Sequence, residues 1–119
     1  MKRLILYALL ILLPSLSAQA DINKVSIDEV KYLLNLVKST PCSIIRNGKR
    51  HDGQAGYDHI QHKYQHFRDK ISSTEDFIAL SASKSTLSGK HYYVQCGSGV
   101  KVRTQDWLLR ELALYRQKS

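Results

Sequence analysis

Apolar side chains recur at helical spacing in several separate stretches of the chain. The first stretch places five of them on one face of a helix: Ile27, Val30, Leu33, Leu34 and Val37. Ser26 and Glu29 match a capping box, in which each side chain satisfies a backbone N–H at the start of a helix. The sequence therefore predicts a helix that begins at Ser26 and ends before Pro41, which cannot continue it.

A second helical pattern runs from about Asp52 to Lys70. Its apolar stripe consists of Ile60, Tyr64, Phe67 and Ile71.

A third helix is indicated by the capping residues Ser72-Ser73-Thr74. The two acidic residues that follow them are stabilised by the positive end of a helix dipole, so the sequence predicts a short helix through about Ser83. Thr104 is the predicted cap of a last helix. The buried side of that helix consists of Trp107, Leu108, Leu112 and Tyr115.

Three short runs have the composition of β-strands. Cys42–Ile45 contains adjacent isoleucines and precedes the turn signal Asn47-Gly48. Tyr92–Cys96 and Val100–Arg103 flank Gly97-Ser98-Gly99, which is typical of a hairpin. The order helix, strand, helix, helix, hairpin, helix predicts an α+β fold: a small antiparallel three-stranded sheet packed with about four helices.

The first twenty residues have the pattern of a cleavable secretory signal peptide. Lys2 and Arg3 precede the apolar run Leu4–Leu13, and Ala18 and Ala20 occupy the small-residue positions of a cleavage site. The run is about half of the roughly 20 apolar residues that a membrane span needs. We therefore predict cleavage after Ala20, a periplasmic location, and a single domain over residues 21–119 with no transmembrane segment.

Two cysteines, Cys42 and Cys96, lie in the predicted mature chain. An exported protein enters a compartment where disulfides persist, so we predict that the two are bonded. Closing such a loop disfavours the unfolded state by about 4 kcal/mol in the chain-entropy model. The bond would also bring the first strand beside the hairpin. The alternative is a pair of free buried thiols.

The chain is strongly basic, with a formal net charge of +8 that falls to 8 − 2 = +6 without Lys2 and Arg3. For an exported protein this charge favours an anionic envelope partner, such as lipid headgroups or a cell-wall polymer, over nucleic acid. The only tight basic cluster is Arg46, Lys49 and Arg50, and a merely soluble cationic surface is the alternative.

Three histidines, His59, His62 and His66, share one face of the second predicted helix. A rise of roughly 1.5 Å per residue separates the first from the last by about 10 Å, too far for one ion. A zinc site needs three or four ligands, and Asp69 is the nearest further candidate. We predict no metal and no cofactor, with His62 and His66 facing water. His59 and Lys63 fall at the border of the buried face.

Several short motifs resemble the YfeK-like family of small exported bacterial proteins of unknown function. They are Arg46-Asn47-Gly48, His59-Ile60, Lys63-Tyr64, Thr74-Glu75 with Phe77-Ile78, Ala82-Ser83-x-Ser85, and Ser88-Gly89-Lys90-x-Tyr92. The resemblance runs from about Ile27 to Leu108 and implies a single-domain periplasmic or secreted protein. It carries over no activity, cofactor or catalytic residue. One departure is His91, where the family pattern has proline; it affects only the rigidity of the loop before the second strand.

The polar members of these motifs come from strand ends and from the helix between them, so neighbouring strands would bring them to one rim. The predicted ligand-binding residues are Arg46, Asn47, His59, Lys63, Ser85, Ser88 and Lys90. The three cations among them favour a carboxylate or phosphate. In the alternative, the Asn-Gly pair is only a turn, the serines only cap helices, and Lys63 only lays its stem along the core edge.

The sequence favours a monomeric binding or interaction module for an anionic envelope ligand or protein partner. The alternative is a small envelope hydrolase that uses His59 with Ser85 or Ser88. That reading lacks a Gly-x-Ser-x-Gly elbow and a specified acidic partner. A third class, an inhibitor or chaperone-like protein, would require an exposed apolar patch.

Overall fold

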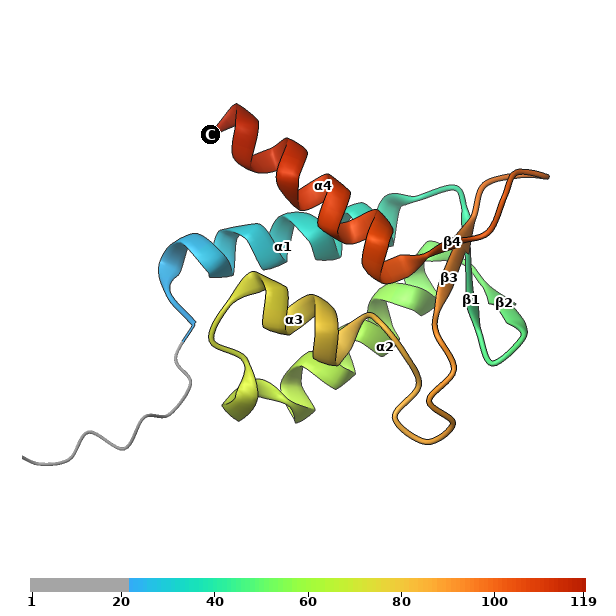
Figure 1. The fold of residues 1–119 in the computed structure, drawn as a ribbon, viewed down its shortest axis with the longest axis horizontal. Helices are drawn as coiled ribbons and strands as arrows, with labels where there is room; N and C mark the ends of the chain where they lie inside the picture. Colours follow the sequence, from blue (N-terminus) through green and yellow to red (C-terminus); the bar gives the residue numbers. More distant parts are fainter. Residues whose placement is uncertain (1–21) are drawn as a thin grey trace, which may run out of the picture.

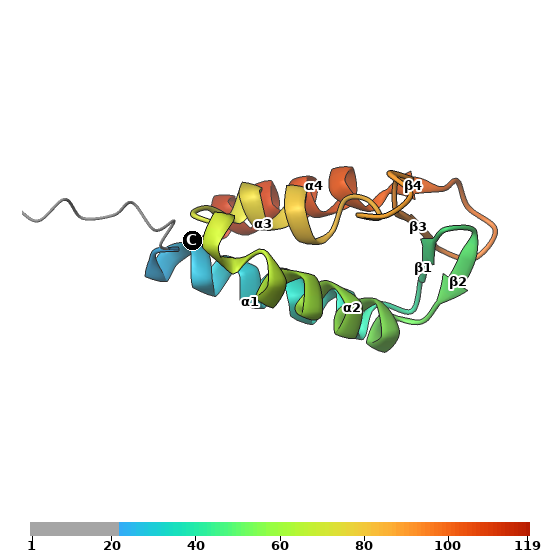
Figure 2. The same ribbon diagram turned by 90° about the horizontal axis from the view of Figure 1, so that it is seen from below.

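Helices and a small sheet occupy opposite ends of the domain in the computed structural model, which describes residues 22–119 (Figures 1 and 2). The helices are α1 Lys24–Ser39, α2 Gly53–His66, α3 Thr74–Ser81 and α4 Thr104–Lys118, with a 3₁₀ turn at Arg68–Lys70. The strands are β1 Ser43–Arg46, β2 Lys49–His51, β3 Tyr93–Gln95 and β4 Val102–Arg103. The α+β class is confirmed. The predicted signal peptide lies outside the described residues.

The sheet has four antiparallel strands in the order β2-β1-β3-β4, so the predicted number of three is wrong. The additional strand, β2, returns from β1 through Asn47 and Gly48, both with positive φ. Such a turn matches the twist of paired strands and favours Asn-Gly. The sequence Lys49-Arg50-His51 has no β-branched or aliphatic side chain, and this is why composition did not indicate a strand.

The disulfide between Cys42 and Cys96 is confirmed. It continues the pairing of β1 with β3 by one step, because Ser43 lies opposite Gln95. The two Cα atoms are 4.3 Å apart, and the bond spans 54 positions of sequence. It therefore holds the two central strands in register at one end, and it suggests an oxidising environment.

Alternation along the strands gives the sheet an inner face toward the helices and an outer face away from them. Ile44 and Val94 are paired and lie in the core on the inner face. An ideal Cβ at Gly56 would lie 2.9 Å from Ile44 Cγ1, so this glycine allows α2 to approach β1 closely. The inner face is thus the side on which α2 can present polar groups to the ends of the strands.

The core lies between the helices and the inner face. Its buried members are Val30, Leu33, Leu34, Val37, Ile44, Ile60, Ile71, Phe77, Ile78, Ala82, Val94, Leu108 and Leu112. Most of the predicted apolar faces of α1 and α4 contribute to it, but Ile27 and Tyr115 lie outside the core and Trp107 is only partly buried. Helix α2 is shorter than predicted and ends at His66, with Ile71 reaching the core from the segment after it. No helix of the described residues is long and apolar enough to cross a membrane.

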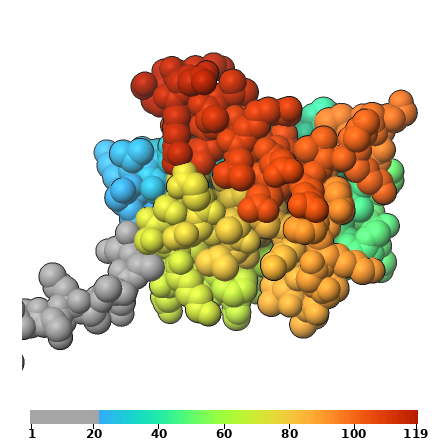
Figure 3. Space-filling view, viewed as in Figure 1, coloured from blue at the N-terminus to red at the C-terminus, as the bar shows by residue number. Residues whose placement is uncertain are grey.

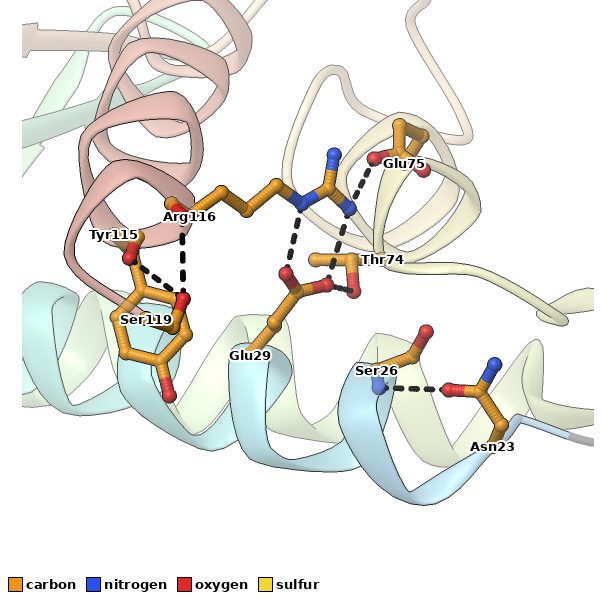
Figure 4. Close-up of polar contacts among 8 residues, drawn as sticks. All are labelled: Asn23, Ser26, Glu29, Thr74, Glu75, Tyr115, Arg116 and Ser119. Atoms are coloured by element: carbon orange, nitrogen blue, oxygen red, sulfur yellow. Dashed lines mark hydrogen bonds and ion pairs between the residues drawn. The ribbon is translucent and has the colours of Figure 1, made fainter.

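The predicted capping box at the start of α1 is wrong. Asn23 is the cap, and its Oδ1 accepts a hydrogen bond of 2.9 Å from the Ser26 N–H. Glu29 is therefore free to point inward, where it binds Arg116 of α4 at 2.7 Å and accepts a 2.7 Å bond from the Thr74 hydroxyl of α3 (Figure 4). The hydrogen bond from Arg116 holds the pKa of Glu29 below its usual value. One carboxylate thus joins three helices.

Side chains cap the N-termini of α2 and α3, but not that of α4. Asp52 Oδ1 accepts from the Ala55 N–H at 2.8 Å, and Ser73 Oγ accepts from the Asp76 N–H at 3.0 Å, as the sequence indicated. Thr104 is instead the first residue of α4 and is fully buried, and its hydroxyl has no hydrogen-bond partner among the described residues. The predicted cap at Thr104 is wrong.

Candidate anion-binding cleft

A cleft of about 460 Å³ lies where β1 ends, β3 begins and α2 passes between them. We call it the α2 cleft. Its wall consists of Arg46, Asn47, His59, His62, Lys63, His66, Phe67, Ser85, Thr86, Leu87 and Tyr92. Arg46 and Tyr92 have the same strand parity as Ile44 and Val94, so the inner face of the sheet turns both toward α2. None of these lining residues is acidic.

Tyr92 is the centre of the polar contacts in the α2 cleft. The residue is buried, and its hydroxyl lies 2.9 Å from His59 Nε2. Lys63 Nζ donates to the same hydroxyl at 3.4 Å. Burial lowers the pKa of His59 to about 4, and the charges of Arg46 and Lys63 add to the effect. His59 is therefore neutral at pH 7, and the ring tautomer sets whether Nε2 or the Tyr92 hydroxyl is the donor of their hydrogen bond.

Lys63 is buried, although lysine is rarely so without a paired charge. Its Nζ donates to the Lys84 backbone carbonyl at 2.7 Å and lies 5.1 Å from the centre of the Tyr92 ring. Burial lowers the pKa of Lys63, and the positive charges of Arg46 and Lys84 lower it further. The ammonium group is thus held by a carbonyl and two aromatic faces rather than by a carboxylate.

Arg46 ends β1 and carries its guanidinium group into the α2 cleft. The Nε atom is buried and has no hydrogen-bond partner among the described residues. A buried donor without an acceptor costs about 1–3 kcal/mol. The positive charge of Arg46 also lowers the pKa of both His59 and Lys63. The cleft therefore combines an unpaired donor with positive potential.

The structure brings most, but not all, of the seven predicted ligand-binding residues together. Arg46, Asn47, His59, Lys63 and Ser85 line the α2 cleft. Ser88 lies next to it and donates to Asn47 Oδ1 at 2.7 Å. Lys90 instead lines a different hollow on the outer face of the sheet. The prediction of a single rim is therefore wrong for Lys90, because the chain crosses from one face to the other before β3.

Sequence reasoning missed Tyr92 as a member of the site. It treated the residue as part of a strand, and nothing in a tyrosine within an aromatic run indicates that its hydroxyl meets a helix. The only available signal was the motif Ser88-Gly89-Lys90-x-Tyr92. His62 and His66 are exposed at the edge of the cleft.

The hydrogen bonds of the described residues do not join His59 to Ser85 or Ser88, the pair that the hydrolase alternative requires. His59 Nε2 faces Tyr92, whereas Ser85 Oγ accepts from the Ser88 backbone N–H at 3.2 Å. Within residues 22–119, no group of three or more His, Cys, Asp or Glu side chains is arranged to hold a metal ion. The cleft is lined by cations and hydrogen-bonding groups, with no acidic side chain.

Comparison with known proteins supplies a family for this fold and cleft. Residues 24–116 match the family of unknown function DUF5329. The chain belongs to this family. The uncharacterized protein YfeK of Salmonella typhimurium is 31% identical over 93 residues, which cover 77% of each chain. The YfeK-like resemblance is thereby confirmed. No solved structure matches the chain.

The DUF5329 match contains the whole α2 cleft, from Arg46 to Tyr92. It also contains Glu29 and Arg116, the ion pair that joins α1 to α4. Membership in DUF5329 brings no activity, because the family has none assigned. The function of the cleft must therefore be inferred from the contacts of the residues that line it.

Proposed function

We propose that this protein is an exported, monomeric binding module that takes a small anionic group, a carboxylate or a phosphate, in the α2 cleft. The observation that carries the proposal is that buried Lys63 and Arg46 line the same cleft, which no acidic residue lines. Cations in a partly desolvated site attract anions more strongly than cations on the surface do. Burial lowers the pKa of Lys63, the charges of Arg46 and Lys84 lower it further, and a bound anion would offset the repulsion among these cations.

The hydrogen-bond donors in the cleft are of the types that bind oxyanions. Arg46 Nε is a buried donor that lacks an acceptor in the described structure, and a guanidinium group binds carboxylate or phosphate with directed hydrogen bonds. Asn47 and Ser88 add polar groups at the edge. Neutral His59 has one donor and one acceptor nitrogen, and Nε2 is the one that meets Tyr92. These groups support an orienting role for Asn47, Ser88 and His59 beside the two cations.

Export is part of the proposal and has independent support. The Cys42–Cys96 disulfide suggests oxidising surroundings, and the sequence predicts a signal peptide at residues 1–20 followed by a single domain at residues 21–119. A periplasmic location would expose the cleft to the anionic headgroups, polymers and metabolites of the cell envelope. The ligand class follows from the charge of the cleft, independently of the location.

Titration calorimetry of the chain from Asp21 onward with inorganic phosphate and with acetate tests the proposal. We expect saturable binding of at least one anion. Arg46→Gln should weaken it by tenfold or more, since a hydrogen bond to a charged group contributes about 1.5–3 kcal/mol. Lys90→Gln is the matched control: it removes the same charge outside the cleft and should change affinity less than about threefold.

Circular dichroism of each variant separates loss of binding from loss of fold. Absence of heat with both anions, or equal affinities for Arg46→Gln and the unsubstituted chain, would overturn the proposal.

A further inference from the structure

The outer face of the sheet is a second surface that the α2 cleft does not use. Register places four paired side chains in a row across all the strands: Arg50, Ile45, Tyr93 and Arg103. Ile45 is buried but does not belong to the core cluster, because it points away from the helices. Figures 1 and 2 show the helices on only one side of the sheet, with none of the described elements covering the other.

This outer face is hollowed and has an apolar centre. A depression of about 580 Å³ lies over Ile45 and Tyr93, with Lys90, His91 and Lys101 at its sides. Asn47 lines both this depression and the α2 cleft, so the two sites are neighbours.

The charges on the outer face have one sign. Lys90 and Lys101 line the depression, and Arg50 and Arg103 occupy the two ends of the paired row. The residues described on this face include no carboxylate. The face is therefore complementary to a negatively charged surface.

An exposed aliphatic side chain is the sequence neighbour of one of these cations. Val100 is 85% exposed and precedes Lys101 in the loop between β3 and β4. Figure 3 shows this loop projecting at the sheet end of the molecule. Leu87, which is also exposed, belongs to the wall of the α2 cleft instead. Binding to a membrane surface depends on electrostatic attraction to anionic lipids together with burial of apolar side chains, and Val100 beside Lys101 offers both kinds of contact.

We propose that the outer face of the sheet docks onto a bilayer that contains anionic phospholipids. Lys90, Lys101 and the two arginines contact headgroup phosphates, and the negative surface potential of the membrane attracts them. Val100 enters the acyl boundary, and Tyr93 lies at the depth where aromatic residues are enriched. A soluble polyanion would neutralise the cations but would leave Val100 in water, which is why the bilayer is favoured. This inference does not depend on anion binding in the α2 cleft.

Sedimentation with lipid vesicles tests the docking. The chain from Asp21 to Ser119 is used, because it contains every described element and omits the apolar run Leu4–Leu13. We expect partition to vesicles of phosphatidylcholine with phosphatidylglycerol, little partition to pure phosphatidylcholine, and weaker binding as salt rises. Lys90→Glu/Lys101→Glu should lower the partition coefficient at least tenfold.

The matched control reverses two lysines at the opposite end of the molecule, at the start of α1 and the end of α4 (Figure 1). Lys24→Glu/Lys118→Glu makes the same change in net charge and should lower partition less than about threefold. Val100→Ser should weaken binding several-fold at high salt, where the apolar contribution remains, whereas Leu114→Ser on α4 should not.

Three results would overturn the inference: no phosphatidylglycerol-dependent partition, equal losses in the two lysine pairs, or unchanged binding of Val100→Ser. Binding to soluble polyglutamate as strong as binding to vesicles would also overturn it, since the site would then recognise an acidic polymer. Circular dichroism and intactness of the disulfide show that each variant is folded.

Discussion

Arg116→Met tests whether the Glu29 carboxylate joins the helices as the structure indicates. Methionine retains most of the apolar stem and removes the guanidinium group. Glu29 is buried and would keep only the Thr74 hydroxyl as a partner, because Arg116 makes the other two hydrogen bonds, at 2.7 and 3.0 Å. We expect a lower free energy of unfolding at pH 7.

The size of this loss in stability depends on the burial of Glu29 and the exposure of Arg116. Removing a partner from a fully buried ion pair costs about 3–5 kcal/mol. The Arg116 side chain is 47% exposed, so solvent screens the interaction, and we discount the loss to about 2 kcal/mol. For a domain of this size the melting temperature should fall by roughly 10 °C. The second ion pair, with Glu75, is exposed on both sides and adds little.

The pH dependence of the free energy of unfolding provides a sharper test than the melting temperature at a single pH. The pKa of Glu29 is lowered in the folded state by the hydrogen bond from Arg116. The pair therefore stabilises the fold fully above the unfolded pKa of about 4.3, and this contribution is lost as pH falls through the folded pKa. The difference between the unsubstituted chain and Arg116→Met should be largest near pH 7 and should shrink in acid.

Urea unfolding at pH 7 and at pH 3 measures both effects. Arg110→Met on the same helix is the matched control, because Arg110 is exposed and has no ion pair among the described residues; it should change stability by less than about 0.5 kcal/mol. A loss at pH 7 no larger than that of the control, or an equal loss at pH 3, would refute the reasoning.

Three further predictions concern packing, the disulfide and titration. Gly56→Ala should destabilise the fold by about 1–3 kcal/mol, because the new methyl group would meet the side chain of Ile44; urea unfolding that matches the unsubstituted chain would show that α2 can move away. Alkylation of the unreduced protein should label neither Cys42 nor Cys96, and reduction should lower the free energy of unfolding by about 4 kcal/mol; labelling of both thiols would exclude the bond. His59 should titrate by NMR with a pKa of about 4, so its contribution to stability is complete above the unfolded pKa of about 6.5 and declines as pH falls toward 4. A midpoint near 6.5 for His59 would contradict its burial.

The elements predicted correctly are those whose signals are local. The apolar faces of α1 and α4 were found because helical spacing repeats over several turns. The starts of α2 and α3 were found because Asp52 and Ser73 cap them through side chains only three residues away. The strand β2 was missed because its three residues are polar and only their pairing with β1 makes them a strand.

The candidate site was predicted in part for the same reason. Arg46, His59 and Lys63 meet in the α2 cleft, and helical phase had placed His59 and Lys63 at the border of the buried face. Lys90 was assigned to the wrong surface, because the chain crosses between the faces of the sheet within a few residues. Tyr92 was missed because its hydroxyl meets residues more than 25 positions earlier in the sequence.

The sequence by itself determined the class of fold, the cysteine pair, the excess of positive charge and the family resemblance, since each depends on composition or on contacts within a few residues. Only the tertiary structure decided that Glu29 would join three helices rather than cap one, that Lys63 would be buried without a carboxylate, and that the cations would divide between a cleft and an open sheet face. These outcomes depend on contacts between residues far apart in the chain, whose partners a local pattern does not identify.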